Sequence, residues 1–208
     1  MGCDKSQEWM LPWTLANIRD AGCNLPVAFA DFGMTAPTRR WCERLGVMVM
    51  SIPRNPRLLT WCMKPIAIRD APFRVALWLD NDVEALRDLT PIFDELGDYD
   101  LAAANDPPNR IAPHWNTGVV LARTSSSILP QWVAASLTGR HRGDQEALNA
   151  LWSKVRHDIR TIDSQYNRLR LAGPEQPGDF IRHWTGPTGK ATIREKIAAA
   201  GAMAQATT

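Results

Sequence analysis

The sequence of 208 residues has few cysteines, and none of them stands in the close pairs that zinc sites use. The four thiols are far apart, at Cys3, Cys23, Cys42 and Cys62. Disulfide frameworks belong to small secreted chains with many more cysteines per residue. We therefore predict reduced thiols, buried in the core of a cytoplasmic protein.

The sequence also lacks long apolar runs and an excess of one charge. No stretch approaches the roughly eighteen apolar residues of a membrane span, and no basic segment followed by an apolar one opens the chain. The 24 Lys and Arg residues are nearly balanced by 22 Asp and Glu, for a net charge of +2. We therefore expect no membrane span and no secretion, while the charge by itself argues neither for nor against nucleic acid.

What the sequence does contain is enough apolar material, 45% of its residues, to bury one substantial core. Short apolar runs alternate with amphipathic stretches, a pattern typical of a layered α/β domain with a mostly parallel sheet. Strands are predicted at residues 27–30, 47–51, 75–79, 101–104, 117–122 and 180–183. Helices are predicted at residues 7–21, 37–45, 59–69, 127–136, 144–152 and 191–200.

The two ends of the chain carry their own predictions. Residues 2–4 look like the end of a first strand whose body is missing, so either the domain tolerates a stub there or the true start lies upstream. Gly201 is a natural stop for the last helix. We therefore predict a single domain over residues 1–201, followed by a frayed tail over residues 202–208.

The strongest local signal is a pair of carboxylates, Asp80 and Asp82, on either side of Asn81 and directly after the apolar strand 75–79. In open α/β sheets, ligands bind beyond the carboxyl ends of strands. Two such carboxylates can hold Mg²⁺ or Mn²⁺, which neutralises a bound diphosphate. The alternative is a turn whose Asp and Asn side chains only satisfy backbone donors.

A second signal lies in the segment 181–190, where His183 ends a predicted strand. Its imidazole can complete a metal shell, although a single histidine is more often a structural hydrogen-bonded residue. The glycine-rich turn that begins at Gly186, together with Lys190, can approach diphosphate oxygens. Trp184 adjoins these groups and is a candidate for ligand contact, as is Trp115 beside the next motif.

A third signal joins the strand 117–122 to the helix that begins at Asp144. Asn116 precedes this strand, where its amide can read sugar hydroxyls, and Gly118 leaves room for a ring to approach. Asp144 either caps the helix or serves the site. Gln145 is the next residue of this helix, and helix capping does not explain a glutamine at that position.

These motifs occur in the same order as in the retaining family-8-like glycosyltransferases of the GT-A fold, and the resemblance spans most of the chain. It implies a GT-A-type three-layer domain, with a mostly parallel central sheet flanked by helices. It also implies that Mn²⁺ or Mg²⁺ is held by Asp80, Asp82 and His183. Lys190 stands one residue later than the lysine of that family.

The same resemblance implies roles around a nucleotide-diphospho-sugar donor. Lys64 would face the donor phosphates, and Asp4 would lie near the base or ribose. Asp144 and Gln145 would flank the donor sugar near its anomeric carbon, as catalytic residues.

The implied activity is metal-dependent transfer of a hexose, from a UDP-sugar, to an acceptor hydroxyl with retention of configuration. The acceptor is a glycan, a protein or, as an alternative, a hydroxymethylated pyrimidine in phage-type DNA. Two alternative hypotheses from other functional classes are a sugar nucleotidyltransferase and a catalytically silent nucleotide-sugar-binding module. The first usually has a glycine-rich basic loop after its first strand, which residues 4–8 lack, and the second would have lost its metal ligands.

Overall fold

The computed structural model describes residues 1–53, 55–106 and 114–206 of the chain. Its strands are β1 (Gly2–Cys3), β2 (Ala28–Asp31), β3 (Met48–Ser51), β4 (Val75–Leu79), β5 (Val83–Ala85), β6 (Leu101–Asn105), β7 (Trp115–Arg123), β8 (Ile159–Ile162), β9 (Arg168–Leu169) and β10 (Ile181–His183). Its α-helices are α1 (Leu11–Asp20), α2 (Ala36–Arg44), α3 (Lys64–Arg69), α4 (Ile128–Leu137), α5 (Asp144–Ala150), α6 (Trp152–Val155) and α7 (Gly186–Ala206). Short 3-10 helices are η1 (Glu8–Met10), η2 (Thr60–Met63), η3 (Thr90–Leu96), η4 (Ser164–Tyr166) and η5 (Arg170–Ala172).

Each strand and helix predicted from the sequence has a counterpart at its place in the chain. The helix predicted at 59–69 is divided into η2 and α3, and the one at 144–152 into α5 and α6. Three further strands, β5, β8 and β9, were not predicted. They contain only three, four and two residues, and no continuous apolar run marks them in the sequence.

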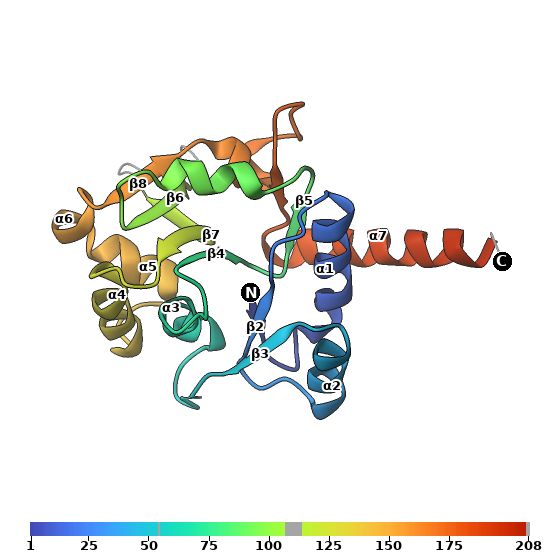
Figure 1. The fold of residues 1–208 in the computed structure, drawn as a ribbon, viewed down its shortest axis with the longest axis horizontal. Coiled ribbons are helices and arrows are strands. Elements are labelled where there is room, and N and C mark those ends of the chain that lie inside the picture. Colours follow the sequence, from blue (N-terminus) through green and yellow to red (C-terminus); the bar gives the residue numbers. More distant parts are fainter. Residues whose placement is uncertain (54, 107–113, 207–208) are drawn as a thin grey trace.

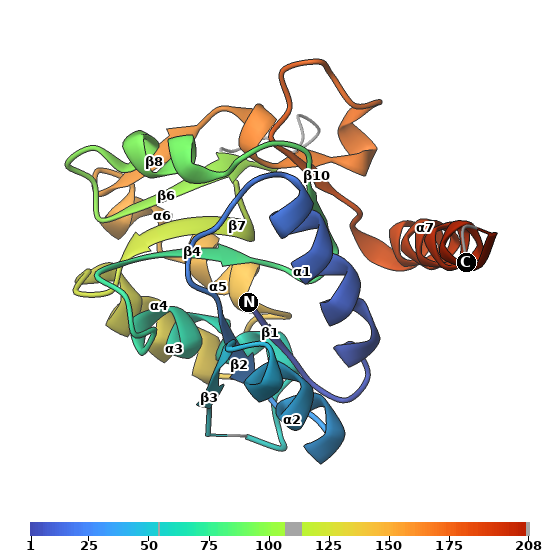
Figure 2. The same ribbon diagram turned by 45° about the vertical axis from the view of Figure 1, so that its right-hand side comes forward.

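The strands form three sheets within the described residues. β1, β2 and β3 pair in parallel in that order, a second sheet has the order β4-β7-β6-β8, and a third has the order β5-β10-β9. Helices flank these sheets on both sides (Figures 1 and 2). The predicted α/β domain with a parallel sheet and flanking helices is confirmed.

The four-stranded sheet differs from the prediction in strand direction. β7 runs antiparallel to both β4 and β6, and in this sheet only β6 and β8 are parallel. A parallel pair needs a crossover of about a dozen residues or more. Residues 106–114, which join β6 to β7 in the sequence, are too few for such a crossover, in agreement with the antiparallel pairing of the two strands. The sheets as a whole are therefore mixed rather than mostly parallel.

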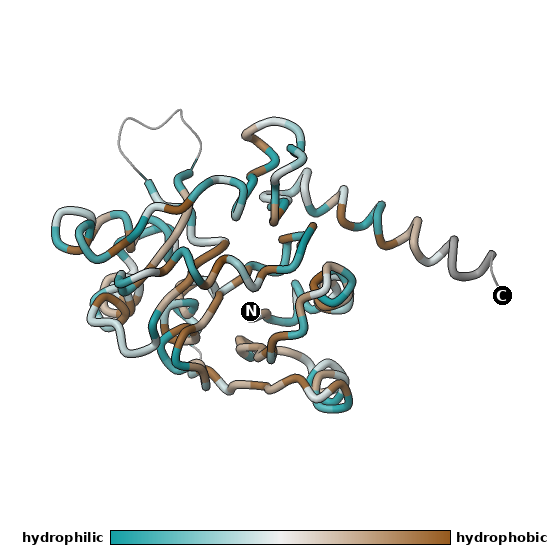
Figure 3. The backbone as a smooth tube through the Cα atoms, turned by 45° about the horizontal axis from the view of Figure 1, so that its top comes forward, coloured by the Kyte–Doolittle hydropathy of each residue, from teal (hydrophilic) through white to brown (hydrophobic). Residues whose placement is uncertain are grey.

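Both faces of the four-stranded sheet are buried, which gives the domain its layers. Leu101 and Ala103 of β6 pack into a cluster with α3, α4 and α5, while Ala102 and Ala104 pack into a second cluster with η3 and η4. Successive residues of a strand point to opposite faces, so apolar residues at all four positions require cover on both sides. The hydrophobic residues accordingly concentrate along the central strands (Figure 3).

The N-terminal strand and the C-terminal helix differ in how they join the domain. β1 is a stub, in which Gly2 and Cys3 pair with Ala30 and Asp31 of β2. Helix α7 begins earlier than predicted and continues past Gly201, and it projects from the body of the molecule (Figure 1). Residues 207–208 of the predicted tail lie outside the described residues. Among the helices that are described, none is long and apolar enough to cross a membrane.

Candidate active site

Two carboxylates and an imidazole from distant parts of the sequence meet beyond β4 and β10. Asp80 follows β4, and its backbone N–H donates to the carbonyl oxygen of Gly118 at 2.8 Å, which ties this turn to β7. Asp82 precedes β5. Because β5 and β10 are antiparallel with Val83 opposite His183, the strand register carries the imidazole to Asp82. The structure thus brings the three predicted metal ligands together.

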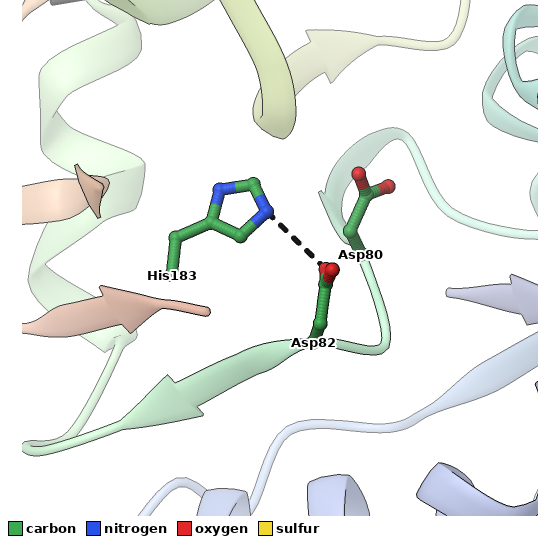
Figure 4. Close-up of side chains that lie close together, drawn as sticks. All are labelled: Asp80, Asp82 and His183. Atoms are coloured by element: carbon green, nitrogen blue, oxygen red, sulfur yellow. Dashed lines mark ion pairs between the residues drawn. The ribbon is translucent and has the colours of Figure 1, made fainter. Parts of the chain in front are cut away.

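The separations of these ligand atoms fit a divalent cation. One atom from each of Asp80, Asp82 and His183 lies within 4.8 Å of the others. His183 Nε2 is 3.2 Å from Asp82 Oδ1 (Figure 4). Ligands about 2.1 Å from Mg²⁺ or Mn²⁺ lie about 3 Å apart when adjacent and about 4.2 Å apart when opposite. Two carboxylates and an imidazole therefore stand close to the positions that a shared cation requires.

The Asp82 carboxylate is held in its ionised form although it is buried. Burial alone would raise its pKa, but the hydrogen bond and charge of His183, together with the charge of Lys190, hold the pKa below its ordinary value. Lys190 Nζ lies 3.6 Å from Asp82 Oδ2. This carboxylate is therefore available as a metal ligand.

Gly118 leaves room for the imidazole of His183, while the predicted room for a sugar ring beside it stays a prediction. A Cβ atom at Gly118 would stand 2.7 Å from His183 Nδ1, closer still to Cε1, and 3.0 Å from Asn116 Oδ1. Carbon and nitrogen atoms that are not bonded normally stay about 3.5 Å apart. The absence of a side chain at this position is thus what lets the imidazole reach the two aspartates.

The side-chain amide of Asn116 is hydrogen-bonded within the protein. Its Oδ1 accepts from the Gly118 backbone N–H and from Asn167 Nδ2, each at 2.9 Å. Its Nδ2 donates to Gln145 Oε1 at 3.1 Å and faces Asp106 Oδ1 at 3.4 Å. These contacts fix the orientation of the amide, and because Asn116 also lines a cavity, its contact with a sugar hydroxyl stays a prediction.

Lys64 is a buried cation surrounded by oxygen atoms. Its Nζ lies 3.0 Å from each of Asp80 Oδ1, Asp144 Oδ2 and the carbonyl oxygen of Thr117. Burial would lower its pKa, but the charges of Asp144 and Asp80 outweigh it and hold the pKa above its ordinary value. Lys64 therefore stays charged, and in this structure it compensates the two carboxylates.

Asp144 and Gln145 begin helix α5 and lie beside the same site. Asp144 is 4% exposed, and besides Lys64 it accepts a hydrogen bond from Thr117 Oγ1 at 2.6 Å. Burial is the main reason that its pKa is raised above the ordinary value. Gln145 Nε2 donates to Asp106 Oδ2 at 2.9 Å, which holds its amide beside Asn116.

Two cavities meet at the carboxylates. Cavity A has a volume of about 340 Å³, and cavity B has about 560 Å³. The residues common to both are Asp80, Asp82, Gln145 and Glu146. Cavity A is further lined by Asp4, Trp61, Lys64, Asp144 and Lys190. Cavity B is further lined by Asn116, Arg142, Leu169, Leu171, His183 and Gly186.

The predicted donor-binding residues near the chain ends divide between these cavities. Asp4 follows β1, and its Oδ2 accepts from Thr60 Oγ1 at 2.9 Å at the wall of cavity A. Residues 186–190 are not an open glycine-rich turn, because they form the first turn of α7. Gly189 lets this turn pack against Trp184, whose carbonyl oxygen a Cβ atom would strike.

The tryptophans near the motifs have structural roles that the sequence did not reveal. The indole N–H of Trp184 donates to Glu84 Oε2 at 2.8 Å, and the cations of Arg182 and Lys196 each lie 5.2 Å from the centre of its ring. Trp115 is fully buried and packs on Trp152. Complete burial corrects the predicted ligand contact of Trp115, whereas that of Trp184 stays a prediction. A different tryptophan, Trp61, is 43% exposed and lines cavity A.

Comparison with known proteins gives matches in structure. No protein-family model matches this sequence, and no curated protein does. The glycosyltransferase GlyE from Streptococcus pneumoniae TIGR4 matches with a TM-score of 0.70 at 18% identity, over 89% of this chain and 53% of GlyE. The galactosyltransferase LgtC, in complex with donor and acceptor sugar analogues, matches with a TM-score of 0.65 at 19% identity, over 89% of this chain and 86% of LgtC. Mouse xyloside xylosyltransferase 1 matches with a TM-score of 0.58 at 11% identity, over 86% of this chain and 91% of that chain.

This chain has the GT-A fold. The predicted fold class is thereby confirmed, and the side chains of Asp80, Asp82 and His183 lie where two cavities of that fold meet. Sequence reasoning missed Asn167 and Trp61 within this GT-A domain. Asn167 directly precedes the short strand β9, which the sequence pattern did not indicate. Trp61 lies on η2, where helical spacing favoured a packing role.

Proposed function

We propose that this chain is a metal-dependent glycosyltransferase that moves a hexose from a nucleotide-diphospho-sugar, a UDP-sugar, to an acceptor hydroxyl. The observation that carries the proposal is the meeting of Asp80, Asp82 and His183 at the junction of cavities A and B. Transfer needs a donor and an acceptor on either side of the carbon that reacts. Two cavities that share carboxylates and an amide provide such an arrangement.

Cavity A is the proposed donor site. Its walls combine Asp4 at the end of β1, the exposed face of Trp61 and the ammonium group of Lys190. An aromatic face suits a base by stacking, and a carboxylate suits ribose hydroxyls. Lys190 stands at the N-terminal turn of α7, where the helix dipole also favours anions. These groups fit the three parts of a nucleotide diphosphate.

The metal supports the leaving group in this proposal. Mn²⁺ or Mg²⁺ held by Asp80, Asp82 and His183 would supply positive charge to the diphosphate as it departs. Lys64 neutralises Asp80 and Asp144 in the structure described here. Its ammonium therefore keeps two carboxylates from repelling the donor phosphates.

Cavity B is the proposed acceptor site, on the other side of Gln145. Its walls combine the apolar side chains of Leu169 and Leu171 with the guanidinium of Arg142. Leu171 is 69% exposed, and exposed apolar surface next to polar groups is typical of a sugar-binding wall. Asp144 and Gln145, at the start of α5, would face the donor sugar. We propose retention of configuration, with these two residues stabilising positive charge on the ring.

The experiment that tests the proposal compares Asp82→Asn with a control, Asp98→Asn, at an exposed aspartate. With a UDP-hexose and Mn²⁺, Asp82→Asn should lower release of UDP by about 10²-fold or more, because one electrostatic contribution to the transition state is lost. Its circular dichroism spectrum should match that of the wild type. Full activity in Asp82→Asn would refute the metal assignment.

A panel of nucleotide sugars identifies the donor in the same system. A ligand that binds only the folded protein raises its thermal midpoint, and the proposal expects the largest rise with a UDP-sugar and Mn²⁺ together. If a sugar nucleotide binds but the wild-type protein neither hydrolyses nor transfers it, the hypothesis of a catalytically silent binding module replaces that of an enzyme. Exchange of pyrophosphate with the donor would instead indicate a nucleotidyltransferase.

A further inference from the structure

A buried amide, Asn167, lies behind the imidazole of His183 on the side away from the aspartates. Asn167 is 1% exposed and directly precedes β9, which pairs in parallel with β10. This pairing places Leu169 opposite His183. The amide therefore reaches the imidazole from a neighbouring strand and not from the same segment of chain.

The direction of each hydrogen bond in this group follows from one backbone donor. The Gly118 backbone N–H can only donate, so the atom of Asn116 that it meets at 2.9 Å is the acceptor Oδ1. The atom of Asn167 that lies 2.9 Å from this oxygen must then be the donor Nδ2. The other end of the same amide, Oδ1, consequently faces His183 Nδ1 at 2.9 Å.

An amide oxygen only accepts hydrogen bonds, so His183 Nδ1 carries the proton of this contact. In an imidazole with one proton, the lone pair is then on Nε2. This nitrogen lies 3.2 Å from Asp82 Oδ1, within the group that fits a cation. Without a cation, a proton on Nε2 makes the hydrogen bond to Asp82, and a bound cation would take the place of that proton. Histidine ligands generally depend on such a partner at their second nitrogen.

We propose that Asn167 is a positioning residue, which holds His183 with Nδ1 protonated and with the Nε2 lone pair directed at the metal site. The inference rests on the proposed function, because it requires that Asp80, Asp82 and His183 bind a cation. Asn167 does not touch that cation. It acts through the tautomer and the orientation of the imidazole, and its own orientation is set by Asn116 and the Gly118 backbone.

Mn²⁺ binding, followed by electron paramagnetic resonance, measures the effect directly. Asn167→Ala should weaken Mn²⁺ binding by about 10- to 100-fold, the range found when such partners of metal-binding histidines are removed. The matched control is Asn24→Ala, which removes an exposed amide from a loop and should leave binding unchanged. Thermal unfolding of both variants shows that they are folded.

A double-mutant cycle separates positioning from a general structural effect. If Asn167 acts through His183, then Asn167→Ala should cause no further loss of Mn²⁺ affinity in a His183→Ala background. Additive losses would mean that Asn167 only supports the fold. If His183→Ala alone leaves Mn²⁺ binding intact, the metal site itself is wrong, and the proposed function fails together with this inference. If His183→Ala weakens binding and Asn167→Ala does not, only the inference fails.

The wild-type protein provides a test that needs no variant. In the Mg²⁺-loaded protein, two-bond ¹H–¹⁵N correlation spectra of the histidine rings should show His183 with a protonated Nδ1 and an unprotonated Nε2. A protonated Nε2 in this state would overturn the inference, whatever the variants do.

Discussion

Replacing Gly118 by alanine tests the geometry of the site most directly. The new Cβ atom would stand 2.7 Å from His183 Nδ1, whereas unbonded atoms of this kind approach to about 3.5 Å. The imidazole must therefore move by about 1 Å or more. Metal sites tolerate deviations in ligand distance of only about 0.2 Å, so His183 should no longer be able to share a cation with Asp80 and Asp82.

The expected consequences of Gly118→Ala are separable. Overpacking in a core costs about 1–3 kcal/mol, and a protein of this size loses about 2–4 °C in its thermal midpoint per kcal/mol. We expect a midpoint lowered by about 2–12 °C and Mn²⁺ binding weakened by at least about 10-fold, as when a histidine ligand is misplaced. Differential scanning calorimetry and Mn²⁺ titration measure the two effects.

The control for this substitution is Gly201→Ala on helix α7, where a new Cβ atom has no neighbour within 4 Å. Alanine favours a helix over glycine by about 0.5–1 kcal/mol, so this variant should be as stable as the wild type or more stable, with unchanged Mn²⁺ binding. Wild-type Mn²⁺ affinity and an unchanged thermal midpoint in Gly118→Ala would refute the argument that Gly118 makes room for His183.

Two further predictions concern buried ionisable groups, the ammonium of Lys64 and the thiol of Cys3. Lys64→Met should lower the free energy of unfolding in urea by about 3–5 kcal/mol, because Asp80 and Asp144 lose their cation. Lys154→Met, at an exposed position, should leave this free energy unchanged. Equal urea midpoints for the two variants would contradict the role of Lys64. Burial raises the pKa of the Cys3 thiol above its ordinary value of 9.0. The contribution of this thiol to the free energy of unfolding is therefore complete below pH 9 and is lost as the pH rises above 9. The loss is about 1.4 kcal/mol per pH unit while the folded thiol stays protonated. Cys3→Ala should reduce this slope in urea titrations between pH 8 and 10, and an identical slope would show that another group causes it.

The sequence alone determined the elements of this protein and the chemistry at the end of one strand. Apolar residues at helical or alternating spacing are local information, so they predicted the principal helices and strands and the position of Asp80 and Asp82 directly after β4. Burial of all four cysteines was predicted from the absence of close cysteine pairs and is observed. Local patterns carry such predictions because a residue's neighbours in sequence are also its neighbours within a helix or strand.

The resemblance implied that His183 joins Asp80 and Asp82, and tertiary structure decided how these and the other side chains meet. His183 reaches Asp82 because β5 pairs with β10 in one register, and β5 is too short to be recognised from its sequence. Gly118 and Asn167 matter only because β7 and β9 bring them beside that imidazole. Trp184 turns toward Glu84, while Trp61 faces a cavity. Contacts of this kind join residues far apart in the chain, and a shift of one residue in the pairing of two strands would turn each side chain to the opposite face.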